Sequence, residues 1–486
     1  MTPNRTRSIR GPRAISQLLV HPLVYLLVAA MAGILLAALM TGNLSARYVK
    51  ALIGGIFFLF LIRLPLFAVV GLFLVIFAFP TYIYLGNTNV IFVLFMLVAW
   101  GVRVRLEKEP IPPKTFLDYA AWCYLAVHVL SLVNVESSEN AIKGIQQIQF
   151  LGAAVALYFL ISKVVRTERH LRLILYALTA SSVLVSITGV MEYIVPTFRL
   201  IPDWFIAAGP AGKRLAEGGR VGGVFGFHGL LADFCAILFI LQLYLFIRLR
   251  NVVVRFALAV LMFAGGFQIF VTANRGGFVV WVIGLLYMAW IGRGALTLRR
   301  ILVALPLILL IGFGLGLFVE EYNEAITLFL RISTTQFERG VPDTRVVVWR
   351  EVMAEIPNHL WIGHGPYYDL RGGTDKIGGR AWPHSAYLFY LWSTGVIGLA
   401  VFLWILVKVF FKSYPGGKLR LGRVSFAQGA MAVAHIQILQ FALAQIRDEH
   451  QRGNVYPYLM WALFGIAVAA RRIHREANRA ERDSGS

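Results

Sequence analysis

Long uninterrupted runs of apolar residues alternate with short basic segments along most of the chain. Several runs exceed the roughly 18 residues that mark a membrane-spanning helix. The predicted spans lie near residues 18–40, 48–63, 64–83, 88–104, 116–134, 147–163, 171–192, 226–248, 252–272, 276–292, 299–318, 384–407, 424–445 and 455–470. The second and third are short and join at Pro65, so we expect about 12 to 14 transmembrane helices. The pattern predicts an all-α polytopic integral membrane protein.

The composition supports this prediction and argues against two other classes of protein. Hydrophobic residues make up 58% of the chain and charged residues 14%, with a mean hydropathy of +0.71; about a quarter of a soluble domain is charged. A net charge of +22 could suggest nucleic-acid binding. Most of that charge lies in short segments between apolar runs, so membrane lipids are the expected partners and nucleic acid is not. Cys123 and Cys235 fall inside predicted spans, which argues against a disulfide framework.

The distribution of lysine and arginine predicts the orientation of the spans. With the arginine-rich N-terminus in the cytoplasm, most of the 46 lysines and arginines lie in segments predicted to be inside. Two long outer loops remain, and loops of such length usually carry function. The chain divides into N-terminal helices (1–192), a first outer loop (193–225), helices with an Arg-Gly-Gly turn (226–318), a second outer loop with an amphipathic helix (319–383), and C-terminal helices with a basic cytoplasmic tail (384–486).

Arginine dominates the cations of the predicted outer face. The outer lysines are Lys50, Lys143, Lys213 and Lys376, and every other outer cation is arginine. Arginine contacts phosphate through a planar, bidentate group and stays charged in dry surroundings. Lipid headgroups and loop carboxylates could also hold these arginines, so the bias by itself only suggests a phosphate-bearing ligand.

Arg275 lies in the stretch ANRGG, between two spans with almost no loop. A cation between two apolar helices is costly unless it has a partner. Gly276 and Gly277 open the next helix, and backbone N–H groups at a helix N-terminus attract anions. The turn is therefore a candidate phosphate cradle, with a snorkelling interfacial cation as the alternative.

Arg345 lies in a predicted amphipathic helix of the second outer loop, between the N-cap residue Asp343 and the stop at Pro357. One stripe of this helix is predicted to hold Arg345, Trp349, Val352, Met353 and Ile356, while Arg350 points elsewhere. A cation on an apolar stripe indicates a helix on the membrane surface that directs Arg345 at a ligand, or an interfacial anchor.

His384 lies at the outer boundary, where a predicted span begins. Histidine can act as a neutral base near physiological pH, although a lone histidine at an interface is often a polar anchor. Two weaker candidates are Arg220 and Asp448. Arg220 lies among glycines that would allow close approach of a ligand, and Asp448 could supply a carboxylate to the site. Other ionisable residues lie in or beside spans without defining a relay: Asp118, His128, Glu192, Asp233 and His435.

Several motifs are absent from the sequence. It has no Walker A loop, no GxGxxG after a strand, no HExxH, no CxxC pair and no Asp-x-Asp. We therefore expect no metal and no ATP, NAD or nucleotide-sugar cofactor. A donor used at the outer face would be lipid-linked, and the arginines suggest that it carries a diphosphate.

Three motifs together resemble one family. His384-Ser385, nine residues and Gly395-Val396-Ile397-Gly398 resemble the signature of O-antigen ligases. ANRGG resembles the arginine-glycine turn of the O-antigen ligase and polymerase superfamily, and DTRVVVWREVMAEIPNHLWIGHGPY resembles its outer-loop segment. The resemblance covers roughly residues 220–400. The chain departs from it where FGFHGLLAD replaces a helix start with Pro-Asn, and where serine rather than asparagine follows His384.

The resemblance implies an enzyme that transfers a glycan from undecaprenyl diphosphate to an acceptor hydroxyl, on the periplasmic face of a bacterial inner membrane, without metal or nucleotide. Arg275 and Arg345 would hold the diphosphate and His384 would activate the acceptor, these being the expected catalytic residues. Expected substrate-binding residues are Arg220, Trp349, Ser385 and Asp448.

Other functions remain open at this stage. The acceptor could be lipid A-core, a growing polysaccharide or a protein hydroxyl, because ligases, polymerases and protein O-glycosylation ligases share these motifs. A lipid-linked-glycan transporter would also need many spans and arginines, but it should show repeat symmetry and polar groups near the midplane. A structural assembly protein without chemistry is the third class.

Overall fold

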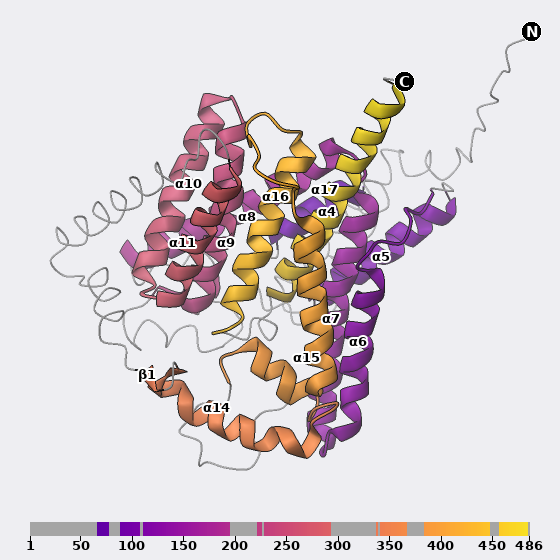
Figure 1. The fold of residues 1–486 in the computed structure, drawn as a ribbon, viewed down its shortest axis with the longest axis vertical. Coiled ribbons are helices and arrows are strands. Elements are labelled where there is room, and N and C mark those ends of the chain that lie inside the picture. Colours follow the sequence, from indigo (N-terminus) through magenta and orange to yellow (C-terminus); the bar gives the residue numbers. More distant parts are fainter. Residues whose placement is uncertain are drawn as a thin grey trace, which may run out of the picture.

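The structure is a computed structural model that describes residues 66–76, 88–106, 110–194, 221–225, 228–292, 337–338, 341–366, 383–447 and 456–484. The predicted spans near 18–40, 48–63 and 299–318 lie outside these residues, as do most of both long outer loops. The described part is helical apart from one antiparallel pair of two-residue strands and the connecting segments, which confirms the all-α class (Figure 1).

Helices from both halves of the chain form one bundle. The N-terminal half contributes α4 (Leu66–Ile76), α5 (Thr88–Leu106), α6 (Asp118–Ser131), η1 (Leu132–Asn134), α7 (Ser138–Val164) and α8 (Glu168–Ile194). The middle contributes η4 (Gly223–Phe225), α9 (His228–Arg248), α10 (Val252–Val271) and α11 (Arg275–Ile291). The last part holds β1 (Phe337–Glu338), β2 (Val341–Pro342), α14 (Asp343–Glu355), η5 (Ile356–His359), α15 (Ala386–Ser413), α16 (Phe426–Ala444) and α17 (Tyr456–Ser484). Every predicted span within the described residues coincides with one of these helices.

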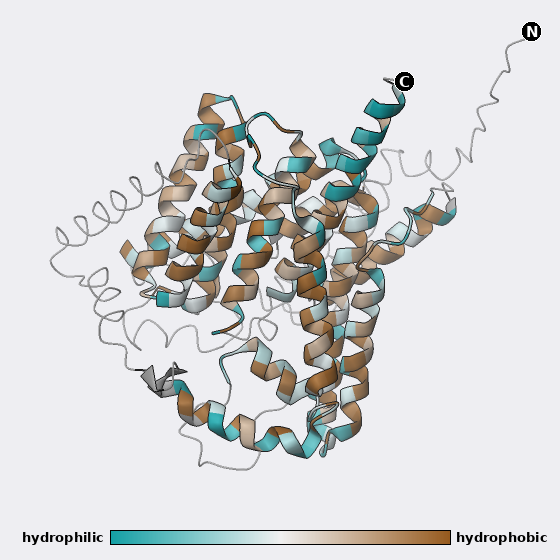
Figure 2. Cartoon of the chain, viewed as in Figure 1, coloured by the Kyte–Doolittle hydropathy of each residue, from teal (hydrophilic) through white to brown (hydrophobic). Residues whose placement is uncertain are grey.

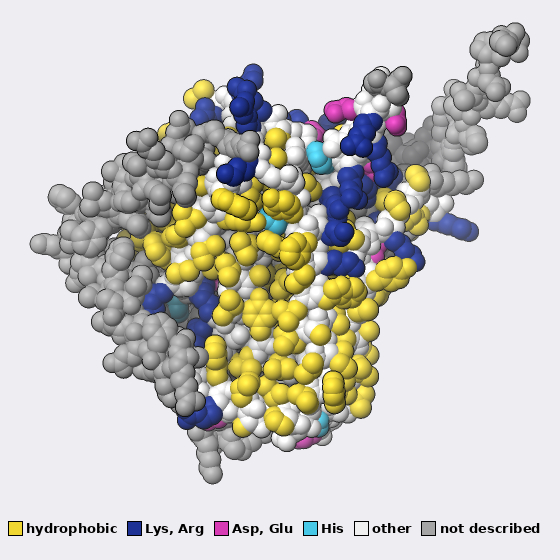
Figure 3. All heavy atoms as spheres, viewed as in Figure 1, with side chains coloured by type: hydrophobic (Ala, Val, Ile, Leu, Met, Phe, Trp, Pro, Cys, Tyr) yellow, Lys and Arg dark blue, Asp and Glu magenta, His cyan; other side chains and the backbone are white. Residues whose placement is uncertain are grey.

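Six described helices are long and apolar enough to cross a membrane, judged by length and composition, namely α7, α8, α9, α10, α15 and α16. Shorter apolar helices are Leu66–Val75 and Arg275–Ile291. Apolar side chains cover much of the described surface in Figure 3. On α10, for example, Val252 is 77% and Phe256 71% exposed. The chain is therefore a multi-pass membrane protein. The total of 12 to 14 spans stays a prediction, because some predicted spans lie outside the described residues.

Three helices extend beyond their predicted spans. Helix α7 begins at Ser138 instead of near 147, α15 continues to Ser413 instead of 407, and α17 continues to Ser484 instead of 470. The added turns are more polar, as the end of α17 shows (Figure 2). Hydropathy detects only the apolar part of a helix, whereas backbone hydrogen bonds and caps carry the helix further; Ser137 caps α7 by accepting the Asn140 N–H at 3.1 Å.

Helix α17 is the centre of the described bundle. It packs against α7 and α16, and every residue from Tyr456 to Ala470 is buried. Buried glutamines fasten the neighbouring helices to one another. Gln440 Nε2 of α16 donates to the Ala236 carbonyl of α9 and the Val280 carbonyl of α11, both at 3.1 Å. These contacts satisfy the amide N–H groups of Gln440 inside the bundle and join α16 to α9 and α11.

Segments predicted to lie on the same side of the membrane contact one another. At the predicted inner end, Arg248 Nη1 donates to the Gly422 carbonyl at 2.8 Å. At the predicted outer end, Asn134 Nδ2 donates to the Gly363 carbonyl at 2.8 Å. Lys and Arg side chains gather in Figure 3 toward the end from which α17 projects. The arrangement agrees with the predicted topology, and the charge rule supplies the expectation that this end is cytoplasmic.

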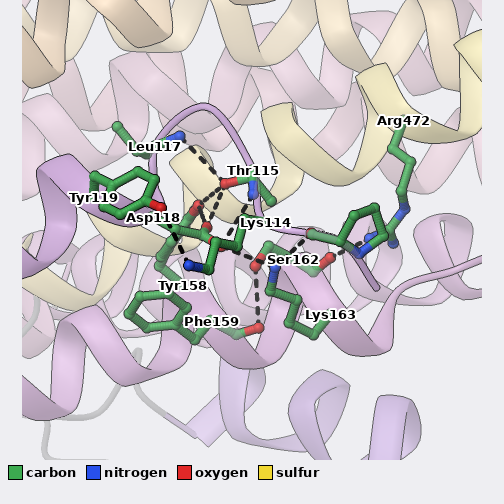
Figure 4. A network of polar contacts seen from close by, with 11 residues as sticks. Lys114, Thr115, Leu117, Asp118, Tyr119, Tyr158, Phe159, Ser162, Lys163 and Arg472 are labelled. Carbon is green, nitrogen blue, oxygen red and sulfur yellow. Dashed lines mark hydrogen bonds and ion pairs between the residues drawn. The ribbon is translucent and has the colours of Figure 1, made fainter. Parts of the chain in front are cut away.

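A buried ion pair joins α6 to α7 near that end (Figure 4). Lys163 Nζ lies 2.9 Å from Asp118 Oδ2, and the two side chains are only 7% and 9% exposed. Asp118 also accepts the Thr115 N–H at 3.0 Å and the Tyr158 hydroxyl at 2.6 Å. Arg472 of α17 donates to carbonyls at the end of α7. The cluster therefore fixes α6, α7 and α17 relative to one another.

Exchange of Lys163 for methionine is expected to lower the free energy of unfolding by about 3 kcal/mol, because Asp118 would stay buried without its counter-charge. We expect the lower end of the usual range, since Thr115 and Tyr158 still donate to the carboxylate. Lys143→Met is the matched control: its pair with Glu139 is exposed, and about 0.5 kcal/mol or less is expected. Unfolding of the purified protein in detergent measures both, and equal losses would contradict the prediction.

Candidate functional site

The N-terminus of α11 forms one corner of the candidate site. Helix α10 ends at Val271 and α11 begins at Arg275, with Ala273 in the left-handed region at φ 47° between them. Asn274 caps α11, because its Oδ1 accepts the Gly277 N–H at 2.9 Å. The helix opens at the Arg-Gly-Gly turn, close to the predicted position. The Gly277 amide, however, is taken by the cap and is not left to an anion.

His384 lies two residues before α15, on a strained stretch of backbone. Its φ is 47°, a conformation uncommon for residues other than glycine. The preceding carbonyl, of Pro383, accepts the Trp349 indole N–H. The Ala386 N–H, on the other side, donates to the Gln445 carbonyl at 2.8 Å. Contacts from α14 and from the end of α16 thus fix the backbone on both sides of the half-buried imidazole.

Arg345 connects α14 to His384. Its Nη1 donates to the His384 carbonyl at 3.3 Å and to the Arg447 carbonyl at 2.6 Å. A guanidinium has five N–H donors in a planar arrangement, so a side chain that holds these carbonyls can also bind an oxyanion. The structure therefore brings Arg345 to the backbone of His384, and the catalytic roles of the two residues stay predictions.

The buried stripe of α14 differs in part from the predicted one. Val348, Val352 and Ile356 pack on Trp392 of α15, and this small apolar cluster holds the helix in place. The prediction is right for Val352 and Ile356 and wrong for Met353, which is 55% exposed. Helical periodicity predicts which residues share a face of α14, but it does not show that Trp392 of α15 packs on the face that carries Val348.

Arg447, which the sequence analysis did not select, connects these parts. Its Nη1 donates to Asn274 Oδ1 at 2.6 Å, and its Nη2 forms an ion pair with Asp233 Oδ1 of α9. Its carbonyl is the acceptor for Arg345. Asp233 was noted only as an intramembrane ionisable residue. The one available signal for Arg447 was its place among the outer arginines.

Two glycine motifs fasten the outer loop to α15. The helix is broken at Gly395, where φ is 68° and ψ is −169°. The break releases backbone groups of α15 that bond to the loop instead: His364 N donates to Trp392 O at 3.0 Å and Gly365 N to Ser393 O at 2.9 Å. In return, Val396 N donates to Leu360 O at 2.8 Å. The loop thus completes the hydrogen bonding of the broken helix.

Close approach of the two backbones explains the glycines at this junction. A Cβ on Gly395 would overlap the Trp361 carbonyl group, and a Cβ on Gly363 would overlap backbone atoms of Ser393. Both glycines also have positive φ. The Gly363-x-Gly365 and Gly395-x-x-Gly398 motifs therefore have an architectural role, and they hold the segment before α15 in one position.

A histidine stacks on this junction. The His364 ring lies 5.2 Å from the Trp392 ring, centroid to centroid, and its Nε2 lies 3.2 Å from the Glu355 carbonyl. Burial lowers the pKa of His364, so the imidazole is neutral at neutral pH and can donate from Nε2 to that carbonyl. This places His364 in the fastening of the loop rather than beside His384.

The remaining predicted residues are placed as follows. Ser385 is 5% exposed and occupies the N-cap position of α15 in extended backbone. Trp349 directs its indole N–H at the Pro383 carbonyl. Arg220 and Asp448 lie outside the described residues. Within the described ranges, no group of three or more His, Cys, Asp or Glu side chains is placed to hold a metal ion.

The fold and these contacts define a class: a multi-pass helical membrane protein with arginines and a histidine gathered at one end of its bundle. A comparison with protein families narrows the class further. Residues 257–403 match the O-antigen ligase family, and this match supports a place for the chain in the O-antigen ligase superfamily. The match supports, in general terms, the function of a glycosyltransferase-like ligase or polymerase, and the family implies a lipid-linked glycan and an acceptor as partners.

The matched segment runs from α10 into α15 and includes Arg275, Arg345 and His384. It does not reach Asp233 on one side or Arg447 on the other. No curated protein matches the chain.

Proposed function

We propose that this protein transfers a glycan from undecaprenyl diphosphate to an acceptor hydroxyl at the periplasmic face of the inner membrane. The observation that carries the proposal is the convergence of Arg345, His384 and the start of α11 through one set of hydrogen bonds. These residues come from three separate segments, and a site for an anionic ligand at the predicted outer end would account for cations and a histidine in one place.

The proposed reaction is a direct displacement at the anomeric carbon. The acceptor oxygen forms the new bond to that carbon while the bond to the diphosphate oxygen breaks, and the electron pair leaves with the diphosphate. The acceptor proton passes to the imidazole of His384. A single displacement of this kind inverts the anomeric centre.

Arg275 and Arg345 are the proposed partners of the leaving diphosphate. Negative charge grows on that group as the bond breaks, and fixed cations in a site that excludes water stabilise it more strongly than water would. Arg275 stands at the positive end of the α11 dipole, which acts in the same direction. No metal ion is required for this stabilisation, since the arginines can supply the charge.

The acceptor distinguishes the candidate functions within the superfamily. Lipid A-core is our first proposal, a growing polysaccharide or a protein hydroxyl is the alternative, and the same residues would serve each. Arg220, Ser385, Trp349 and Asp448 are proposed as contributors to substrate binding. A transporter is disfavoured because the arginines and His384 gather at one end of the bundle and not at its midplane.

An in vitro transfer reaction tests the proposal. Purified full-length protein in detergent receives an undecaprenyl-diphosphate glycan and lipid A-core, with EDTA present and no nucleotide, beside Arg275→Ala. We expect transfer by the wild type and a loss of about 10²- to 10³-fold in the variant, the usual effect of removing one charge-stabilising donor. Mass spectrometry identifies the product.

The products separate the alternatives. Chain growth on the donor without a lipid A-core product would assign a polymerase. Transfer that stops with EDTA and returns with a divalent cation would contradict the metal-independent reaction. Absence of product, with the donor bound by a folded protein, would favour a transporter or another acceptor.

A further inference from the structure

We infer that Arg447 is a positioning residue of this site: held by Asp233 and Asn274, it sets the relative placement of Arg345, His384 and the start of α11. The inference rests on the proposed function and adds to it a residue outside the segment that matches the family. Two sets of hydrogen bonds, the space at Gly276 and the electrostatics of Asp233 support it.

The guanidinium of Arg447 connects α9 to α11. It forms an ion pair with Asp233, whose side chain is fully buried, while the Arg447 side chain is 17% exposed. The same group donates to Asn274 Oδ1 at 2.6 Å, and this oxygen also caps α11 through Gly277 N. Arg447 is therefore bonded to the cap residue that directly precedes Arg275.

The backbone of the same segment connects α14 to α15. The Arg447 carbonyl accepts Arg345 Nη1 at 2.6 Å, and the Gln445 carbonyl accepts the Ala386 N–H at 2.8 Å. The second bond is made two residues after His384, and the first is made by Arg345, which also bonds to the His384 carbonyl. A shift of the segment after α16 would therefore move Arg345 and His384 together, relative to Arg275.

Gly276 provides the space for this arrangement. A Cβ built on Gly276 would overlap Cδ and Nε of Arg447. The second residue of the Arg-Gly-Gly turn thus lies directly beneath the Arg447 side chain. This gives the glycine a role of its own: it admits the cation that holds the turn against Asp233.

Electrostatics gives Asp233 and Arg447 a further reason to be paired. A buried carboxylate near the start of α11 would repel a diphosphate bound there and would be costly to desolvate. Arg447 neutralises that charge and leaves Arg275 and Arg345 as the cations directed at the ligand. Arg447 is also close enough to act electrostatically on His228, the first residue of α9.

The test displaces the Arg447 side chain without removing a polar group. Gly276→Ala does this by collision, and Gly266→Ala in α10 is the matched control, because its Cβ would meet no atom of the described residues within 4 Å. Arg447→Lys is the second variant, since one ammonium on a flexible stem cannot reproduce the planar contacts with Asp233 and Asn274. For Gly276→Ala and Arg447→Lys we expect a fall of about tenfold or more in kcat for glycan transfer, with Gly266→Ala equal to wild type.

A double-mutant cycle separates positioning from general destabilisation. Arg345→Lys is measured in the wild type and in the Gly276→Ala background, or in Arg447→Lys if the alanine variant does not fold. If Arg447 positions Arg345, the fold-loss of kcat caused by Arg345→Lys is at least about fivefold smaller in the altered background than in the wild type, because Arg345 is already displaced there. Losses that simply multiply would overturn the inference.

A second readout distinguishes this inference from the proposed function. Binding of undecaprenyl diphosphate to the same purified variants is measured by native mass spectrometry. If the wild type binds this lipid but transfers no glycan, the proposed function fails, and the cycle is then evaluated on binding alone. Coupled losses of affinity would still support the positioning role, and independent losses would refute it.

Discussion

Exchange of His384 for asparagine is expected to lower kcat of glycan transfer by about 10²- to 10⁴-fold, the usual contribution of a general base. The imidazole is the proposed acceptor of the proton from the attacking hydroxyl, and the amide of asparagine cannot take that role near neutral pH. Asparagine also tolerates the left-handed backbone that His384 adopts at φ 47°. The protein should therefore fold and keep two bonds that use backbone carbonyls: from Arg345 to the carbonyl of residue 384, and from Trp349 to the Pro383 carbonyl.

His384→Ala serves as the control for the backbone. Alanine also lacks the base, but it adds a conformational cost of about 1 kcal/mol at positive φ. We expect both variants to lose transfer to the same extent and only the alanine variant to unfold more easily, measured by initial rates and by thermal unfolding in detergent. An asparagine variant within about threefold of wild-type kcat would remove His384 from the proposed chemistry.

Gly395→Ala is expected to lower the free energy of unfolding by about 4 kcal/mol or more, and to abolish transfer with it. Two costs add at this position. The residue has φ 68°, which disfavours any side chain, and the new Cβ would overlap the Trp361 carbonyl. Relief of the overlap requires the outer loop to leave α15, which would break the hydrogen bonds from His364, Gly365 and Val396.

Gly416→Ala separates these two costs. Gly416 has φ 84°, but its Cβ would meet no atom of the described residues within 4 Å. This variant should therefore show only the backbone cost, about 1–2 kcal/mol. Thermal unfolding and limited proteolysis of the outer loop measure the difference. Equal destabilisation in the two variants would mean that the close contact between the loop and α15 is not needed.

The sequence by itself determined the class of the protein and most of its helices. An apolar run such as that of α9 has no stable place in water, so composition and length alone predict a membrane helix. Local signals also located some helix ends. Asn274 stands directly before the Arg-Gly-Gly turn and caps α11 with its own side chain, a contact that spans three residues. Such features depend on neighbours in the chain, which the sequence displays directly.

The candidate site was predictable only in part. Arg275, Arg345 and His384 could be selected because their residue types and motifs are unusual at a membrane boundary. The sequence could not predict how these three residues are connected in space, because the connection runs through Arg447. That residue bonds to Asp233, 214 positions away, and to Arg345, 102 positions away. No periodicity or spacing links such positions.

The tertiary structure also decided what the glycine motifs do. In the sequence, Gly363 and Gly395 lie in two motifs that resemble those of one family. In the fold they meet, because α15 breaks where the outer loop arrives to bond its released backbone groups. Hydropathy reports the average environment of one segment, and it predicts a membrane helix reliably because about twenty residues contribute to the average. Ion pairs and backbone contacts each depend on a few atoms within about 3 Å, and only the packing of helices from distant parts of the chain sets those distances.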